Sequence, residues 1–176
     1  MYKEAMRAAW AEINLTNLDF NIKQIKNKVG KDVKITGIIK ADGYGHGSVK
    51  CASVLKDNGI DSFGVATLSE AIKLRNAGYV DEQILILGMT PEPYAEVITE
   101  YDLTPVICGY SNAEAINNTA RKAGKTVSKE CPVKSRIRDE VLLCHIAYYV
   151  NVTHMLYHAS YRYRHHEKER SPVESG

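Results

Sequence analysis

The sequence predicts an α/β protein built around a parallel β-sheet, and three observations support this fold class. Short apolar, β-branched runs recur along residues 33–108, and segments with helical spacing follow them. Residues that cap helices precede most of these segments, and a glycine follows most of them. The unit of strand, loop, capped helix and glycine repeats about four times, which is typical of βα architecture.

The first helix is predicted from residue 16 onward. Thr16 and Asp19 resemble a capping box, in which a hydroxyl and a carboxylate accept hydrogen bonds from free backbone N–H groups. The apolar residues that follow fall on one helix face: Leu18, Ile22, Ile25 and Val29. Gly30 ends the segment, because glycine readily adopts the left-handed conformation found after helices.

Four further helices are predicted from the same start and stop signals. Their starts and their terminal glycines are Thr67 with Glu70 and then Gly78, Thr90-Pro91, Ser111 with Glu114 and then Gly124, and Gly47 to Lys56 followed by Gly59. Proline suits the first helical position, where its missing N–H would have no partner.

Four apolar runs are predicted to be the strands of the sheet: Val33 to Ile39, Ser62 to Ala66, Gln83 to Leu87 and Leu103 to Cys108. They are continuous rather than alternating, as expected for parallel strands that are covered on both faces. The pattern does not distinguish an open sheet from a closed barrel.

Composition excludes several classes of protein. Of 176 residues, 44% are hydrophobic and 25% charged, which is ordinary for a globular chain, and the net charge of +2 does not indicate a nucleic-acid or membrane partner. No apolar run approaches the roughly 18 residues of a membrane span, and the polar N-terminus is not a secretory signal. The cysteines, Cys51, Cys108, Cys131 and Cys144, form no C-x-x-C pair, so we expect reduced thiols in a cytoplasmic protein.

A change in composition divides the chain into residues 1–128 and 129–176. The first part holds 15 basic and 15 acidic residues, whereas the second holds eight basic and six acidic. The second part also carries five of the six histidines and five of the eleven tyrosines, but one of the twelve glycines. We therefore expect a domain boundary near residue 128.

Residues 38–47, IIKADGYGHG, form the candidate site, because ligands of parallel α/β folds bind at the carboxyl ends of strands. Lys40 ends an apolar strand, where partial desolvation would lower its pKa and favour the neutral amine that Schiff-base chemistry requires. The glycines that follow allow backbone N–H groups to approach a phosphate before a helix.

Simpler interpretations of this segment also exist. Lysines commonly end strands where a strand meets water, and from spacing alone this interpretation is favoured over a reactive lysine. The segment lacks the third glycine of a dinucleotide-binding fingerprint, with Ser48 in its place.

Residues 38–47 resemble the pyridoxal-phosphate attachment motif of the alanine racemase family, (V/I)-(V/I)-K-A-(D/N)-(A/G)-Y-G-H-G. The similarity extends on both sides. Residues 10–21, WAEINLTNLDFN, resemble the opening strand and first helix of the family, and the segments 69–78 and 84–88 resemble a later helix and the strand after it. In total it covers roughly residues 8–127.

The resemblance implies a partial (β/α)₈ TIM barrel and a role for three residues. Lys40 would form the Schiff base with pyridoxal 5′-phosphate and act as a base on one face of the substrate. Tyr44 would donate its hydroxyl to the cofactor phosphate, and Leu87 would line the apolar wall beside the ring. His46 we assign to the helix start, as a structural residue. The implied reaction interconverts L-alanine and D-alanine, a cell wall precursor, in a homodimer.

Other residues of the family pattern are missing. The family places a second acid–base group, a tyrosine, in a C-terminal β domain, and its barrel continues with H-x-K-x-D-T-G-M-x-R. Residues 126–138, TVSKECPVKSRIR, do not match that strand. We therefore expect a truncated chain whose own activity is incomplete. The alternatives are a non-catalytic pyridoxal-phosphate-binding module and an inactive truncated product.

Residues 129–176 are interpreted as a divergent tail without a metal site. His154 and His158 stand four apart, as metal ligands on a helix can, with Cys131, Cys144 and His145 as possible additions. No C-x-x-C or H-E-x-x-H motif accompanies them, so we expect no metal. Residues 141–152 are apolar enough for a short helix or strand, and the charged end after residue 160 is predicted to be solvated.

Overall fold

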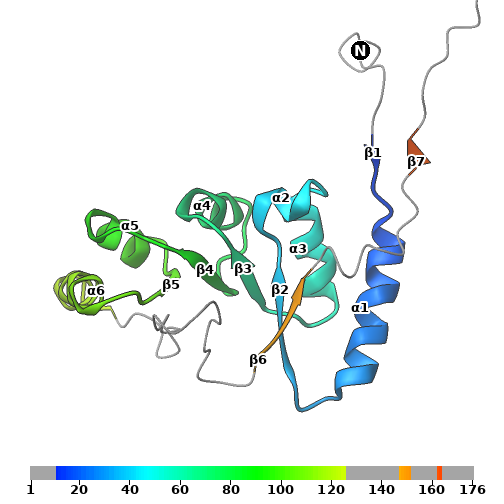
Figure 1. Ribbon diagram of the computed structural model, residues 1–176, viewed down its shortest axis with the longest axis horizontal. Coiled ribbons are helices and arrows are strands. Elements are labelled where there is room, and N and C mark those ends of the chain that lie inside the picture. The colour runs from blue at the N-terminus through cyan, green and yellow to red at the C-terminus, as the bar shows by residue number, and fades with distance from the viewer. Residues whose placement is uncertain (1–10, 126–146, 152–161, 164–176) are drawn as a thin grey trace, which may run out of the picture.

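The computed structural model describes residues 11–125, 147–151 and 162–163 (Figure 1). Its strands are β1 (Ala11–Glu12), β2 (Lys34–Ile38), β3 (Ser62–Val65), β4 (Gln83–Met89), β5 (Thr104–Val106), β6 (Ala147–Asn151) and β7 (Arg162–Tyr163). Its helices are α1 (Leu15–Val29), α2 (Lys40–Tyr44), α3 (Ser48–Asp57), α4 (Leu68–Asn76), α5 (Ala95–Glu100) and α6 (Tyr110–Lys122), with the 3₁₀ helix η1 (Glu92–Tyr94) before α5.

The main sheet has five strands in the order β5-β4-β3-β2-β6, and each neighbouring pair is parallel. β2, β3, β4 and β5 are each followed by helix, so the four predicted βα units are confirmed. Among the described residues, β5 and β6 are unpaired edges, so the sheet is open, as the expected partial (β/α)₈ barrel requires. Separately, β1 and β7 form a two-residue antiparallel pair.

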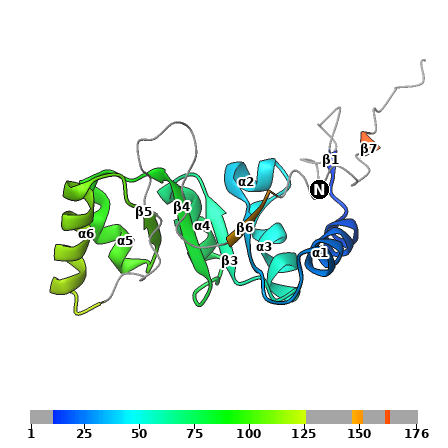
Figure 2. The same cartoon turned by 60° about the horizontal axis from the view of Figure 1, so that its bottom comes forward.

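The helices follow one another along the sheet, from α6 at one end to α1 at the other (Figure 2). Alternate strand residues, Phe63 and Val65 on β3 and Ile84 and Ile86 on β4, belong to one buried cluster. Each helix from α1 to α6 except the short α2 adds side chains to this same cluster: Leu18, Ile22, Cys51, Ala52, Leu55, Ala71, Leu74, Ala95, Ile98 and Ile116. The helices therefore cover one face of the sheet, and the hydrophobic core lies between that face and the helices.

The opposite face of the sheet carries a polar row near the amino ends of three strands. Thr36 Oγ1 and Ser62 Oγ lie 3.0 Å apart on β2 and β3. Ser62 Oγ also donates to Gln83 Oε1 on β4, at 3.3 Å. Thr36 and Ser62 are almost fully buried. These bonds therefore avoid the free-energy cost of burying hydroxyl groups without hydrogen-bond partners.

Three of the predicted helix starts are wrong, and the one at Thr67 is confirmed. Pro91 is the extended residue before η1 and not the first helical residue, as the Thr90-Pro91 start predicted. Helix α1 begins one residue before Thr16, and Asn14 caps it by accepting from the Asn17 N–H at 3.1 Å. Asp19 instead pairs with Lys23, one helical turn later. Helix α6 begins at Tyr110, and not at the predicted Ser111. Its N-cap residue is Gly109, which has no side chain to accept a capping hydrogen bond. The Thr67–Glu70 capping box at α4 is present in full.

Two elements lie within the predicted tail. Ala147–Asn151 forms strand β6, as the apolar run 141–152 allowed, and it pairs with β2 over five residues. Arg162–Tyr163 forms β7, so these two residues pair with β1 although we expected a solvated end. The histidines and cysteines weighed there, His145, His154, His158, Cys131 and Cys144, lie outside the described residues, as does the segment 126–138.

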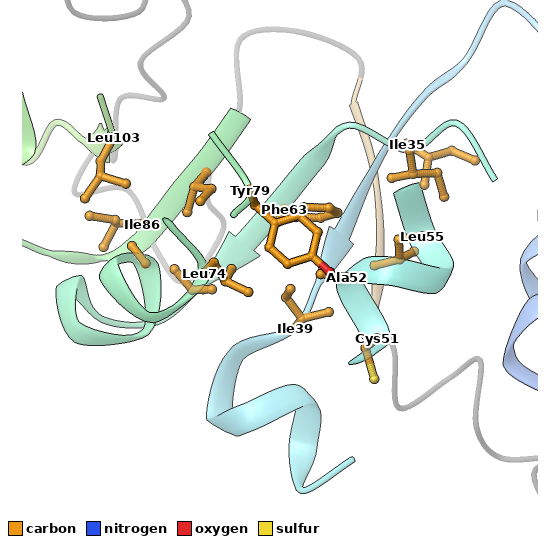
Figure 3. Close-up of a cluster of buried hydrophobic side chains, with 14 of the residues drawn as sticks. Ile35, Ile39, Cys51, Ala52, Leu55, Phe63, Leu74, Tyr79, Ile86 and Leu103 are labelled. Atoms are coloured by element: carbon orange, nitrogen blue, oxygen red, sulfur yellow. The ribbon is translucent and has the colours of Figure 1, made fainter. Parts of the chain in front are cut away.

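The two phenylalanines of the chain provide a test of this core. Phe63 is fully buried and makes an edge-to-face contact with Tyr79, at 5.5 Å between ring centres, whereas Phe20 is 60% exposed. Figure 3 shows Phe63 and Tyr79 among Leu74, Leu55 and Ile39. We expect Phe63→Ala to lower the free energy of unfolding by about 3–5 kcal/mol. Phe20→Ala should change it by less than about 0.5 kcal/mol in the same urea titration. Equal effects would contradict the assignment of the core.

Candidate functional site

Lys40 stands two residues after Ile38, the last residue of β2, at the carboxyl end of the sheet. Ile39, the residue before it, donates its N–H to Gly64 O at 2.9 Å and buries its side chain in the core. Lys40 itself is half-buried and begins the turn labelled α2. The predicted placement of a lysine at the end of an apolar strand is thus what the structure shows.

The turn after Lys40 is left-handed. Ala41, Asp42, Gly43, Tyr44 and Gly45 all have positive φ, between 50° and 84°. Three of these residues carry a side chain, and left-handed backbone costs about 1–2 kcal/mol for each such residue. The chain therefore stores strain beside Lys40, and neighbouring groups must hold the turn in place.

Backbone hydrogen bonds close the turn on itself. Gly43 donates to Ile39 O at 2.9 Å, Gly45 to Ala41 O at 3.0 Å, and Gly47 to Asp42 O at 2.8 Å. The buried His46 ring lies with Nδ1 2.8 Å from Gly43 O. This contact supports the structural role that we expected for His46.

Helix α4 holds the same turn through the side chain of Glu70. Its Oε1 accepts from the Ala41 N–H at 2.7 Å. Its Oε2 accepts from the N–H groups of Ala66, at 2.7 Å, and Thr67, at 3.2 Å, in the loop after β3. One carboxylate therefore joins the carboxyl ends of two neighbouring strands.

Asp42 is the second anchor of the turn. Its Oδ1 accepts from the Ser48 N–H at 3.0 Å, from the Ser48 hydroxyl at 2.9 Å and from Lys73 Nζ at 2.7 Å. The ammonium of Lys73 is the largest cause that lowers the pKa of Asp42 to about 2, followed by the Ser48 bonds. Because the unfolded value is near 3.8, this carboxylate stabilises the fold above that pH and loses its contribution as the pH falls toward 2.

The Cys51 thiol lies against this turn but is not activated. Burial first, and then the negative charge of Asp42, raise the pKa of Cys51 to about 11. The thiol therefore stays protonated at neutral pH, and thiolate chemistry is not available there.

Of the other two predicted site residues, Tyr44 lies close to Lys40 in sequence and Leu87 lies far from it. Tyr44 belongs to the same left-handed turn, and its half-buried ring packs against the core. Leu87 lies on β4, two strands away. A methyl group built on Gly64 would meet Ile38 Cδ1 at 2.5 Å and Leu87 Cδ1 at 3.6 Å, so Leu87 and Ile38 line the same face of the sheet.

Between described residues, a cavity lies at each end of the strands, and the predicted site residues line neither of these two. A cavity of about 360 Å³ lies between the loops after β3 and β4, beside Thr67, Ile72, Met89 and Tyr94. A cavity of about 290 Å³ lies at the amino ends of the strands. Within the described part of the chain, no cluster of three or more His, Cys, Asp or Glu side chains is arranged to hold a metal ion. No helix there is long and apolar enough to cross a membrane.

Sequence reasoning missed the residues that hold the turn. Glu70 was recognised as a helix cap, but its second role, at Ala41, joins residues 29 positions apart. Lys73 and Asp42 are 31 positions apart. No local pattern signals such pairs.

The Asp42–Lys73 pair yields a direct prediction. Lys73→Met should raise the pKa of Asp42 from about 2 toward 3.8, because it removes the largest cause of the lowering. The measurement is an NMR titration of the Asp42 carboxyl carbon. Lys23→Met is the matched control, since it breaks a helical ion pair of the same 2.7 Å length to Asp19. An unchanged pKa of Asp42 in K73M would show that the Ser48 bonds alone hold it down.

The sequence and the fold were compared with those of known proteins. Residues 13–130 match the family described as alanine racemase, N-terminal domain. The alanine racemase of Clostridium kluyveri is 42% identical over 121 residues, which are 69% of this chain and 30% of that protein.

Solved structures give the same result. The alanine racemase of Clostridium difficile 630 is 41% identical, with a TM-score of 0.64 over 68% of this chain and 31% of that one. The alanine racemase of Bartonella henselae, solved with covalently bound pyridoxal phosphate, shares the fold at 23% identity, with a TM-score of 0.63 over 75% and 37% of the two chains. The chain thus spans about a third of the length of these relatives. With the N-terminal domain matched over residues 13–130, it belongs to the alanine racemase family.

Proposed function

We propose that this chain holds pyridoxal 5′-phosphate on Lys40 and supplies one of the two acid–base groups for interconverting L-alanine and D-alanine. The observation that carries the proposal is the placement of Lys40 at the carboxyl end of a parallel strand, next to a strained turn that Ser48 of α3 and Glu70 and Lys73 of α4 fix. Reactive groups of such folds stand at this end of the sheet.

The residues present fit this cofactor in three respects. Lys40 offers the amine that a covalent bond to the aldehyde requires. Tyr44 offers a hydroxyl donor for the phosphate from the same turn. Leu87, with Ile38 and Gly64, offers an apolar wall on the sheet face that the helices leave free. When bound, the cofactor would supply the electron sink that stabilises negative charge at the α-carbon of the substrate.

Lys40 would move the proton on one face of the α-carbon. A racemase needs an acid–base group on each face, because one amine reaches only one of them. The proposal therefore assigns Lys40 half of the proton transfer. A pyridoxal-phosphate-binding module without turnover is the second candidate, since the described residues supply a base on one face of the α-carbon through Lys40 alone in this proposal.

The proposal also covers the division of the chain, its assembly and its compartment in the cell. The family match ends at residue 130, which supports a division of the chain near residue 128 into a cofactor-binding portion and a divergent tail. We extend the proposal to a homodimer as the active assembly. The cytoplasm is the proposed compartment, since Cys51 and Cys108 are both free thiols.

Borohydride trapping tests cofactor attachment. After incubation with pyridoxal 5′-phosphate, reduction and digestion, we expect mass spectrometry to find the phosphopyridoxyl group mainly on the Lys40 peptide. Lys40→Arg should lose this adduct, whereas Lys50→Arg, a change on the exposed side of α3, should keep it. A label spread over the surface lysines in both variants would refute attachment at Lys40.

Proton exchange separates a one-base site from a complete racemase. In heavy water, we expect the loaded chain to replace the α-proton of L-alanine with deuterium at least about tenfold faster than it forms D-alanine, because a single base returns the proton to the same face. NMR measures the exchange and chiral chromatography measures the racemisation. Equal rates would show that a second acid–base group is at work. An adduct on Lys40 with no exchange would favour the binding module.

A further inference from the structure

Helix α4 contacts the turn after Lys40 at two successive residues. Glu70 and Lys73 stand three positions apart, so they share one face of the helix. Glu70 binds the backbone N–H of Ala41, at 2.7 Å, and Lys73 binds the carboxylate of Asp42, also at 2.7 Å. The helix therefore holds the two residues that directly follow Lys40, one through its backbone and one through its side chain.

The bond from Glu70 acts on the peptide that links Lys40 to Ala41. A peptide unit is planar, so fixing the direction of its N–H fixes the plane attached to the Lys40 Cα. Ala41 has φ of 50° and ψ of 47°, a conformation that an alanine rarely adopts without support. The Glu70 carboxylate supplies that support, and it thereby sets the direction in which the Lys40 side chain leaves the backbone.

The same carboxylate also fixes Lys40 relative to the neighbouring strand. The ladder between β2 and β3 ends with the bond from Ile39 N to Gly64 O. Two residues further along each strand, Glu70 joins Ala41 to Ala66 and Thr67. It therefore continues the link between the two strand ends at the point where the backbones diverge.

We propose that Glu70 and Lys73 are positioning residues for Lys40, an inference that rests on the proposed attachment of the cofactor there. Helix capping needs only Oε2 of Glu70 together with the Thr67 hydroxyl. The use of Oε1 on Ala41 goes beyond what capping requires. The Lys73–Asp42 pair is about half exposed on both sides, and exposed pairs add little stability, so its effect is on geometry.

Two variants of α4 separate positioning from capping. Glu70→Gln leaves one acceptor oxygen where two are used, so either Ala41 or the Ala66–Thr67 loop loses its partner. Thr67→Ala is the matched control: it removes the capping hydroxyl but leaves both carboxylate oxygens. We expect the rate of phosphopyridoxyl attachment at Lys40, normalised to Lys50 in the same sample, to fall about tenfold in E70Q and to stay within twofold in T67A.

The comparison is made on folded protein only. Circular dichroism and urea midpoints establish that both variants are folded and similarly stable. Equal attachment rates in E70Q and T67A would overturn the role of Glu70. Should E70Q not fold, the Asp42–Lys73 pair carries the test. D42N, K73M and the double variant should all slow attachment at Lys40 by the same factor of about three, because each of them removes the same single contact. If the two slowing factors multiply in the double variant, or if none of these variants slows attachment at Lys40, the positioning role of the Asp42–Lys73 pair is overturned.

A readout without cofactor keeps this inference separate from the proposed function. Trace acetylation with acetic anhydride compares the reactivity of Lys40 with that of Lys50 in the same molecule. Because a released turn exposes the amine, we expect the Lys40 to Lys50 ratio to rise about threefold in E70Q and to stay constant in T67A. If the parent chain gains no adduct on Lys40, the proposed function fails, yet this ratio still decides whether Glu70 positions the lysine.

Discussion

The left-handed turn after Lys40 is the constraint on which the site depends. Five successive residues with positive φ, three of them with side chains, are unfavourable in isolation. The turn persists because Ser48 at the start of α3 and Glu70 and Lys73 on α4 all bind it. Those helices are in turn held by the core, through residues such as Leu55 and Leu74. The candidate site is thus tied to the packing of two βα units, and a lysine in an isolated peptide of the same sequence would lack this support.

The two faces of the sheet carry different side chains. The face under the helices holds the large apolar side chains. On the other face, the polar row of Thr36, Ser62 and Gln83 lies near the amino ends of the strands, while Ile38 and Leu87 lie near the carboxyl ends. In a closed eight-stranded barrel this second face is the interior, and the last strand pairs with the first. Here β6, from beyond the matched residues 13–130, lies parallel to β2 at that position and gives the strand before Lys40 a partner on each side.

Local rules predicted much of the fold, and tertiary contacts explain what they did not. The four apolar runs became β2 to β5 because burial on both faces leaves a clear signal in sequence. The Thr67–Glu70 box formed because its partners are three residues apart. Asn14 displaced Thr16 as the first cap because Asp19, the expected partner, bonds Lys23 and Asn58 instead. At the candidate site, a motif pointed to Lys40 and Tyr44 but not to Glu70 and Lys73, since the contacts of those two with the turn exist only after β2 and β3 have paired.

The charge at position 42 bears on which nucleophile the turn offers to an aldehyde. The family pattern accepts aspartate or asparagine there, and this chain has aspartate, with Lys73 as its counter-ion. The carboxylate acts on Cys51 as well, whose sulfur is 3.3 Å from a methyl group built on Gly43. Burial and this charge both favour the protonated thiol, which is a poor nucleophile. Cys51 is also fully buried, whereas Lys40 is half-buried at the end of the strand. The anchor that fixes the turn therefore adds to the effect of burial in disfavouring the Cys51 thiolate, whereas the proposed attachment point is the half-buried amine of Lys40.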